Sequence, residues 1–468
     1  MSSARRTSPI TPLRIESPST DSQPLLLACA GFGVIPCPPA EETSARAPIP
    51  RIDLPGITLI IGPSGTGKST LLRTIAQYIP HHKLRIVPAI LTEKHKRTAV
   101  FDLLDGNEFQ RAATLTKAGL AEPSLWPRAA GTLSEGEQAR LRFALAMHRA
   151  NADDVVIADE FASTLDRLTA YAVACTAQRW AQSTAVQLIA ASAHEDLASM
   201  LPADRTIDAR TGTIAPAQTA HTQTIRIEPG TPEDYHALSH LHYRSGNPAS
   251  VVRILRAIRE VPAHLDPSGQ ILAGVLIVRM PTLNNAHRHR AWGEMFSTGN
   301  KPHDARQINA HLRTISRVIV DPRSRGLGIA TMLVRAYLDN PLTPCTEATA
   351  AMGSLCPFFE RAGMTPFEIY PDHTDLRLLD ALTHMRIQPH ALLGLQPQPN
   401  TLLMRELTTW ARARKLIHPD QNPIESIARL TPIAACRLCS RPRAYAFLYG
   451  GEITDDHDPP ALPATTDT

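Results

Sequence analysis

The chain has 468 residues, which is too long for one ordinary domain, so we expect two or three. Its composition is globular, with 43% hydrophobic and 20% charged residues, and the net charge of +4 permits an acidic partner without requiring one. No apolar run reaches about 18 residues, which excludes a membrane-spanning helix. The seven scattered cysteines disfavour a disulfide framework and indicate a cytoplasmic protein.

Changes in composition divide the chain into four segments. Residues 1–23 are rich in Ser, Thr and Pro and predict a disordered tail. In residues 24–215, short apolar runs alternate with helical stretches, which predicts an α/β domain with a buried parallel sheet. A polar linker leads to a second domain over 224–380, and a small, mostly helical extension over 381–468 follows.

The first domain carries a glycine-rich loop, GPSGTGKST at 62–70, between an apolar strand at 57–61 and a helix. In such a loop, glycines let backbone N–H groups turn onto phosphate oxygens, and the helix adds its positive N-terminal end. Lys68 is expected to reach the β- and γ-phosphates of ATP, and the Ser69 hydroxyl to bind Mg²⁺. The residues predicted to hold the nucleotide are Gly62, Ser64, Gly65, Thr66, Gly67, Lys68, Ser69 and Thr70.

Four further pieces follow in order. They are the run LSEGEQ at 133–138, Asp159-Glu160 after an apolar strand, the run STLD at 163–166, and His194 after a third strand. Together with the glycine loop, these pieces resemble the signature, Walker B, D-loop and switch histidine of ATP-binding-cassette (ABC) ATPases. The resemblance implies an ABC-type P-loop NTPase fold for this domain.

The resemblance also implies roles. Asp159 and Ser69 would hold Mg²⁺, and Glu160 would polarise the attacking water. His194 would contact the γ-phosphate, and Lys68 would also be a catalytic residue. Ser134 and Gly136 would complete the ATP site of another protomer, which implies an ATP-dependent, head-to-tail homodimer.

Two positions depart from the family pattern, and one aromatic residue has two interpretations. Glu135 stands where the signature commonly has Gly, and Gln110 is the nearest candidate for the glutamine loop. Phe32 either stacks on adenine or packs in the core.

The second domain carries its own glycine loop after a strand, in the run SRVIVDPRSRGLGIA at 316–330. The strand–loop–helix order makes an anion site, but no Lys-Ser follows, so it is not a second ATP loop. The pattern Arg323-x-x-Gly326-x-Gly328 resembles motif A of GNAT-type N-acetyltransferases, which implies a GNAT-like mixed α/β fold and binding of acetyl-CoA or another acyl-CoA. The implied contacts are Val318, Val320, Arg323, Arg325, Gly326, Leu327, Gly328, Ile329 and Ala330.

Two more segments resemble that family, namely the opening strand and helix at 225–234 and the run PFFERAGM at 357–364. The family often has a tyrosine as general acid where this chain has Phe359. Glu294 and Glu347 are candidate bases and Cys356 and Tyr370 candidate proton donors, each with a structural role as the alternative.

Basic residues gather between positions 244 and 290. Arg253, Arg256 and Arg259 recur every three residues, which predicts one helix face that is either solvated or a groove for a nucleic-acid backbone. Near the end, Cys436 and Cys439 have the spacing of a zinc knuckle, but without a second pair two free thiols are favoured.

The sequence therefore predicts an ATP-hydrolysing protein fused to a CoA-dependent N-acyltransferase domain that acts on a macromolecule such as RNA or DNA. One alternative is a mechanical ATPase whose second domain only binds a nucleic-acid or protein target. Another is the ATPase subunit of a transporter.

Overall fold

The computed structural model describes residues 13–16, 34–37, 56–201, 203–216, 224–242, 248–263, 265–285, 287–399, 401–418 and 423–451. The chain forms two compact units, Met1–Asp53 and Leu54–Thr468. In the first unit, β1 (Leu13–Glu16) pairs in parallel with β2 (Val34–Cys37), so a strand lies within the segment predicted as a tail. The rest of that tail and Phe32 lie outside the described residues.

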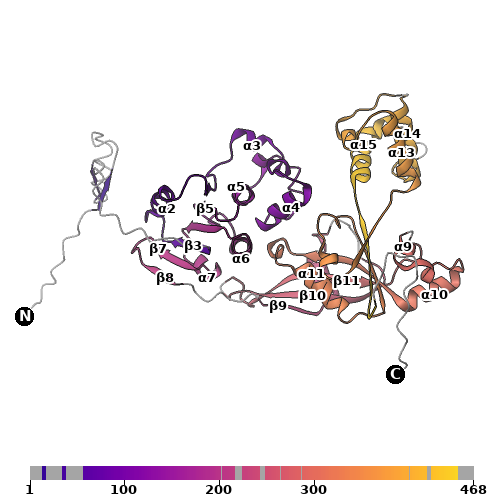
Figure 1. The fold of residues 1–468 in the computed structure, drawn as a ribbon, viewed down its shortest axis with the longest axis horizontal. Coiled ribbons are helices and arrows are strands. Elements are labelled where there is room, and N and C mark those ends of the chain that lie inside the picture. Colours follow the sequence, from indigo (N-terminus) through magenta and orange to yellow (C-terminus); the bar gives the residue numbers. More distant parts are fainter. Residues whose placement is uncertain are drawn as a thin grey trace, which may run out of the picture. The chain divides into compact units, whose positions relative to one another are not determined.

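The second unit begins with a six-stranded sheet in the order β4-β5-β6-β3-β7-β8 (Figure 1). The strands run in parallel except for β8, and the buried apolar side chains of β3, β5 and β6 account for the short apolar runs that predicted an α/β domain. The order brings the carboxyl ends of β3, β6 and β5 to one edge. The strands are β3 (Gly56–Ile61), β4 (Leu84–Ile86), β5 (Val155–Ala158), β6 (Gln187–Ser192), β7 (Arg205–Asp208) and β8 (Ile214–Pro216).

Two long helices of this part, α5 and α6, begin at side-chain caps that the motifs supply. Ser134 accepts a hydrogen bond from the Glu137 N–H at the start of α5, and Asp166 does the same for Thr169 at the start of α6. The signature and the D-loop segment are therefore also the local signals that start two long helices. The helices are α2 (Lys68–Gln77), α3 (Glu93–Arg97), α4 (Glu108–Lys117), α5 (Glu135–Arg149), α6 (Arg167–Thr184) and α7 (Leu197–Met200), with 3-10 turns at Val100–Leu103 and Ala130–Thr132.

A second, seven-stranded sheet has the order β14-β15-β13-β12-β11-β10-β9. All neighbours are antiparallel except β12 and β13, which are parallel and joined through helix α11 (Ile329–Leu338). The strands are β9 (Ile225–Pro229), β10 (Val251–Glu260), β11 (Gln270–Arg279), β12 (Leu312–Val320), β13 (Cys345–Ala350), β14 (Thr365–Glu368) and β15 (Arg443–Leu448). The remaining helices of this part are α8 (Pro232–Ser239), α9 (Arg288–Trp292), α10 (Lys301–His311) and α12 (Phe358–Arg361), with 3-10 turns at Gly293–Phe296 and Pro322–Ser324.

The last part of the chain differs from the expected helical extension. Its helices form a bundle with its own apolar core, which includes Leu382, Leu407 and Trp410, and the chain then returns as β15 between β13 and β14. We call residues 370–441 the helical lobe (yellow end of the colour range in Figure 1). In the sequence, the helical lobe lies between β14 and β15, which are neighbours in the sheet. Its elements are α13 (His373–His384), η5 (Pro389–Gly394), α14 (Leu402–Ala413) and α15 (Pro423–Cys439).

The predicted arginine-bearing helix is wrong, because Arg253, Arg256 and Arg259 belong to strand β10. The β-branched and apolar residues between the arginines fit a strand in a half-buried sheet better than a helix. Arg256 is ion-paired with Glu228 and Asp234, and Arg259 is buried, so these arginines do not form the predicted face. Among the described residues, no helix has the length and apolar character needed to cross a bilayer.

Candidate functional site

The first glycine loop has a backbone that favours anions. Gly65 and Gly67 have φ of 82° and 85°, a left-handed conformation that costs glycine little, and Gly67 directly precedes α2. Several backbone N–H groups of the loop and the first helical turn donate to no acceptor among the described residues. These are the N–H groups of Gly65, Gly67, Lys68, Ser69 and Thr70. Such a row of unused donors at a helix N-terminus binds phosphate.

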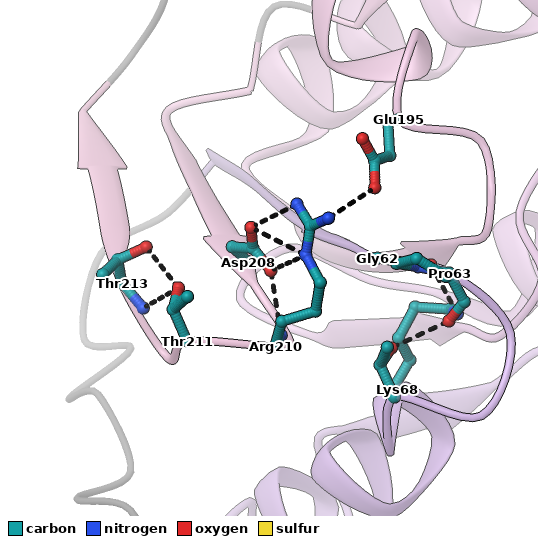
Figure 2. Close-up of polar contacts among 9 residues, drawn as sticks. Gly62, Pro63, Lys68, Glu195, Asp208, Arg210, Thr211 and Thr213 are labelled. Carbon is teal, nitrogen blue, oxygen red and sulfur yellow. Dashed lines mark hydrogen bonds and ion pairs between the residues drawn. The ribbon is translucent and has the colours of Figure 1, made fainter. Parts of the chain in front are cut away.

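Lys68 is folded back onto the loop that precedes it. Its Nζ donates to the carbonyl oxygens of Gly62 and Pro63, at 2.7 Å each, and the side chain is only 9% exposed (Figure 2). A lysine ammonium has three donors, so one remains for a phosphate oxygen without a change of position.

The loop and the carboxylates after β5 share one pocket of about 490 Å³. Its lining residues are Ser64, Gly65, Gly67, Lys68, Ser69, Thr70, Asp159, Glu160, Ser163, Thr164 and Ala193. Gly62 and Thr66 are not among them; the Thr66 hydroxyl instead donates to the Pro63 carbonyl. The structure therefore gathers most of the predicted nucleotide-binding residues around a single cavity.

The end of β5 presents two carboxylates to this pocket. Both Asp159 and Glu160 are exposed, and Glu160 has a φ of 51°, which turns the chain sharply after the strand. The Asp159 carboxylate accepts a hydrogen bond from the Glu160 N–H at 3.0 Å. A carboxylate and the Ser69 hydroxyl in one pocket suit Mg²⁺, which takes few protein ligands and completes its shell with water and phosphate oxygens.

His194 is held near the same pocket by two backbone contacts. Its Nε2 lies 2.9 Å from the carbonyl oxygen of Ser163, and its N–H donates to the Ser192 hydroxyl. Beside it, Arg210 pairs with both Glu195 and Asp208, which ties the loop after β6 to the loop after β7 (Figure 2). Sequence reasoning missed this pair of contacts, because the His194 motif does not include Glu195 and the loop after β7 has no motif.

The signature residues lie outside this pocket. Ser134 serves as a helix cap, and a Cβ added at Gly136 would lie 3.1 Å from the Leu165 side chain, so that glycine allows a close approach of the D-loop segment. Gln110 also has a local role, because its side-chain oxygen accepts from the Asn107 N–H in a capping box at the start of α4. The structure thus gives no support to Gln110 as a nucleotide contact.

The second glycine loop repeats the backbone of the first. Gly326 and Gly328 have φ of 78° and 83°, close to the values at Gly65 and Gly67, and Gly328 directly precedes α11. Among the described residues, no acceptor is bonded to the N–H groups of Gly326, Leu327, Gly328, Ile329 or Ala330. The position that corresponds to Lys68 holds Ile329, which is 1% exposed. The loop therefore offers backbone donors without an ammonium group.

The two arginines predicted to contact the ligand are already engaged. Arg323 forms two hydrogen bonds with the Asp321 carboxylate, which raise the pKa of this arginine. Arg325 donates to the carbonyl oxygens of Val320 and Ala121, and burial lowers its pKa. Anion binding at this loop therefore depends on the backbone amides.

Strand β12 leads into this loop with one edge partly unpaired. Its ladder with β13 covers only Leu312–Ile315, whereas its ladder with β11 continues to Val320. Within the described sheet, the stretch that contains Val318 and Val320 therefore has a strand partner on one side only. An extended ligand with amide groups could pair with the other side.

Of the candidate acid–base residues, Cys356 interacts electrostatically with Arg325 of the loop. Glu347 is buried in an ion pair with Arg288 and also accepts from the Thr314 hydroxyl. Tyr370 is 58% exposed under the guanidinium of Arg290, and Glu294 is exposed. Cys356 is half-buried, and burial raises its pKa. None of these four has the geometry of an evident base or acid.

Phe359 stands where a tyrosine is common in the resembled family. Its side chain is buried and lies beside Tyr445. The Tyr445 ring on β15 is 4.9 Å from the Phe359 ring, and its hydroxyl donates to Glu360. Burial, followed by the charge of Glu360, raises the pKa of Tyr445 to about 12, which makes it a weak acid. Cys436 and Cys439 are exposed free thiols, and the described residues contain no cluster of three metal-ligating side chains.

Comparisons with known proteins support the first domain only. Residues 52–163 match a family model described as "ABC transporter", which covers the segment from the glycine loop to Ser163. This match, with the pocket above, supports an ABC-type ATPase domain that binds nucleotide. No curated protein matches the chain.

Solved structures of ABC proteins are also similar to this chain. An ABC transporter cassette in its ADP conformation is 17% identical over 34% of this chain and 78% of its own, with a TM-score of 0.27. The cbiO1 protein from Clostridium perfringens, part of an ABC transporter complex, is 16% identical over 34% of this chain and 75% of its own, with a TM-score of 0.28. A dimeric ATP-binding cassette bound to ADP and Pi is 17% identical over 35% of this chain and 86% of its own, with a TM-score of 0.29.

Proposed function

We propose that this protein hydrolyses ATP in its first domain and binds an acyl-CoA in its second, from which it transfers the acyl group to an amine. The observation that carries the second half is the loop at Gly326–Gly328. It has the backbone of the first glycine loop, lacks a lysine, and lies at the end of a strand with an unpaired edge.

The first domain holds the groups that ATP hydrolysis requires in one pocket. Backbone N–H groups and Lys68 would hold the phosphates, while Ser69 and Asp159 would hold Mg²⁺, which supplies charge neutralisation. Glu160 would orient and deprotonate the attacking water, and His194 would lie close to the γ-phosphate. These roles follow from the ABC resemblance and are proposals for each residue.

The second loop suits the diphosphate of CoA better than a nucleoside triphosphate. A diphosphate can be held by amides alone, whereas the transferred phosphate of ATP needs a lysine or an equivalent charge. The pantetheine arm carries two amides, which could pair with the open edge of β12 near Val318 and Val320. Seven strands with a single parallel pair, and the two glycines before α11, support this proposal of a GNAT-like domain.

The proposed reaction is aminolysis of a thioester. The amine nitrogen attacks the acyl carbon, a C–N bond forms and the C–S bond breaks, so that CoA leaves as a thiol after the amine proton is passed to it. The strand position of Arg253, Arg256 and Arg259 removes the argument for a nucleic-acid groove there. We therefore define the acceptor only as an amine.

A second function is favoured by a specific observation. Phe359 replaces the usual acid, and Glu347 is committed to Arg288, so a domain that binds acyl-CoA or another anion without chemistry fits these positions. In that case the second domain would direct the ATPase to a target.

The test is calorimetric titration of the full chain with acetyl-CoA. In Gly328→Val the affinity should fall at least about tenfold, because a β-branched residue disfavours a φ of 83° and its side chain would lie beside the bound diphosphate. The control is Gly394→Val. Like Gly328, Gly394 has open space where a Cβ would be added, but it has no positive φ and lies in the helical lobe.

The outcomes separate the two functions. Acetyl-CoA binding with release of CoA thiol in the presence of amines supports the acyltransferase. Binding without release supports the second function. A folded protein with wild-type ATPase activity and no affinity for any CoA contradicts both uses of this loop.

A further inference from the structure

Arg259 is a buried cation that has no carboxylate partner in the part of the chain that the structure describes. Its side chain is 1% exposed, and no Asp or Glu among the described residues lies within ion-pair distance of it. Within the described ranges, its Nε has no hydrogen-bond partner, although the side chain lies between α6 and the second glycine loop. Burial of an unpaired charge is costly, so such a group calls for an explanation.

The contacts of Arg259 join the second glycine loop to a helix of the ATPase domain. One side of the guanidinium donates to the carbonyl oxygen of Arg323 and lies 3.5 Å from the Ser324 hydroxyl. The other side lies over the Tyr171 ring at 4.6 Å and 3.9 Å from Cys175 Sγ, and both of these residues belong to α6. A single side chain therefore bridges the loop and α6.

Two other contacts strengthen this junction. A Cβ added at Gly326 would lie 3.1 Å from the Thr176 methyl group, so the loop packs directly on α6. Arg325 donates to the carbonyl oxygen of Ala121, which lies just after α4. The loop is thus held from the ATPase side at three points.

Helix α6 begins at the nucleotide pocket. Ser163 lines that pocket and contacts His194, and Asp166, three residues later, caps α6. Against the opposing effect of burial, hydrogen bonds from Thr169 and the charge of Arg323 lower the pKa of Asp166. The α6 cap is therefore close enough to the second loop for the two to interact electrostatically.

We propose that Arg259 is a positioning residue that makes anion binding at the Gly326–Gly328 loop depend on the nucleotide state of the ATPase domain. The proposal rests on the acyl-CoA site proposed above. A diphosphate on the loop supplies the negative charge that Arg259 lacks, and any movement of α6 on ATP binding shifts the guanidinium and the loop together. By linkage, CoA must then change the affinity for ATP by the same factor.

The experiment measures CoA affinity by calorimetry in the full chain carrying Glu160→Gln, with and without ATP and Mg²⁺. CoA without an acyl group avoids turnover. We expect the two dissociation constants to differ at least about fivefold, within the range of allosteric couplings. Adding Arg259→Met should reduce that ratio to about one and weaken CoA binding, whereas Arg259→Lys, which retains the charge, should keep part of the ratio.

The matched control is Arg253→Gln on the same strand. Arg253 donates to the Asn340 carbonyl oxygen and stacks on Tyr337, and these contacts stay within the second domain, so the ratio should be unchanged. If thermal unfolding shows that Arg259→Met does not fold, Tyr171→Leu is the substitute. It removes the ring that Arg259 stacks on, and the same loss of the ratio is expected.

The outcomes distinguish the inference from the function on which it rests. If CoA binds with the same affinity with and without ATP, the coupling is overturned and the acyl-CoA site stays intact. The same holds if the ratio of the two CoA dissociation constants is unchanged in Arg259→Met. Absence of CoA binding in every variant overturns the site and the coupling together.

Discussion

Lys68 and Glu160 line one pocket, yet their loss should affect different steps of ATP turnover. Lys68→Met removes a charge-assisted contact to phosphate, so nucleotide affinity should fall. Glu160→Gln keeps the shape but removes the base, so ATP should bind normally while turnover falls about 100-fold or more. Calorimetry and a phosphate-release assay measure the two effects. Glu108→Gln, an exposed carboxylate on α4, is the control. Turnover of Glu160→Gln at the wild-type rate would show that Glu160 is not the base.

Glu347 is expected to act on stability rather than on chemistry. It is buried against Arg288, so Glu347→Gln leaves a buried guanidinium without its partner and should lower the free energy of unfolding by about 3 kcal/mol. Urea unfolding measures this change. The exposed Glu294, changed to Gln, should shift stability by less than about 0.5 kcal/mol. A stable Glu347→Gln protein that had lost acyl transfer would instead restore Glu347 as a base.

At the scale of elements, the helical lobe should be dispensable for the second sheet. Glu368 of β14 and Arg443 of β15 are directly paired, so an Asn-Gly turn in place of residues 370–441 would close a tight hairpin. The lobe has its own core, and its removal should leave a folded sheet and wild-type ATPase activity. Circular dichroism and thermal unfolding test this.

The contrasting variant is one that also lacks β15. Without it, β14 loses the strand it pairs with and β13 keeps only β12, so strand edges are exposed, which favours aggregation. If the lobe deletion alone were insoluble, the lobe would be a necessary part of the domain.

At the scale of the whole molecule, ATP should drive self-association. Ser134 and Gly136 do not line the pocket of their own chain, so a site completed by the signature requires a second copy. Sedimentation velocity of Glu160→Gln should show a dimer with ATP and Mg²⁺ and a monomer with ADP. A monomer under both conditions at tens of micromolar protein would argue against the head-to-tail arrangement.

The parts of the fold that local physics determines were predictable from the sequence. The α/β class is confirmed, and the strand–loop–helix order around both glycine loops follows from residues that are neighbours in the chain. The prediction of a helix was wrong for Arg253, Arg256 and Arg259. Their spacing of three resembles a helix face, but pairing with β11 and β9 makes this segment a strand.

Features that depend on distant partners were not predictable. Arg259 contacts Tyr171 and Cys175 of α6, the latter 84 residues earlier in the chain, and Glu347 contacts Arg288 from another element. The sequence next to each of these residues does not indicate which distant residue it will contact. The signal for Gln110 as a cap was local, since Asn107 lies three residues before it, a common spacing for a helix start.

The position of β15 has a consequence for how the protein is made. Strands β13 and β15 are direct neighbours, but about 90 residues separate them in the chain, and the helical lobe is synthesised in between. Non-local pairing of this kind slows folding, because loop closure precedes the contacts that stabilise it. On the ribosome, every strand of the six-stranded sheet emerges before the second sheet begins at Ile225, whereas the second sheet waits with an open edge until residue 448 has emerged. During that interval the edge of β13 that β15 later covers is open to pairing with other chains.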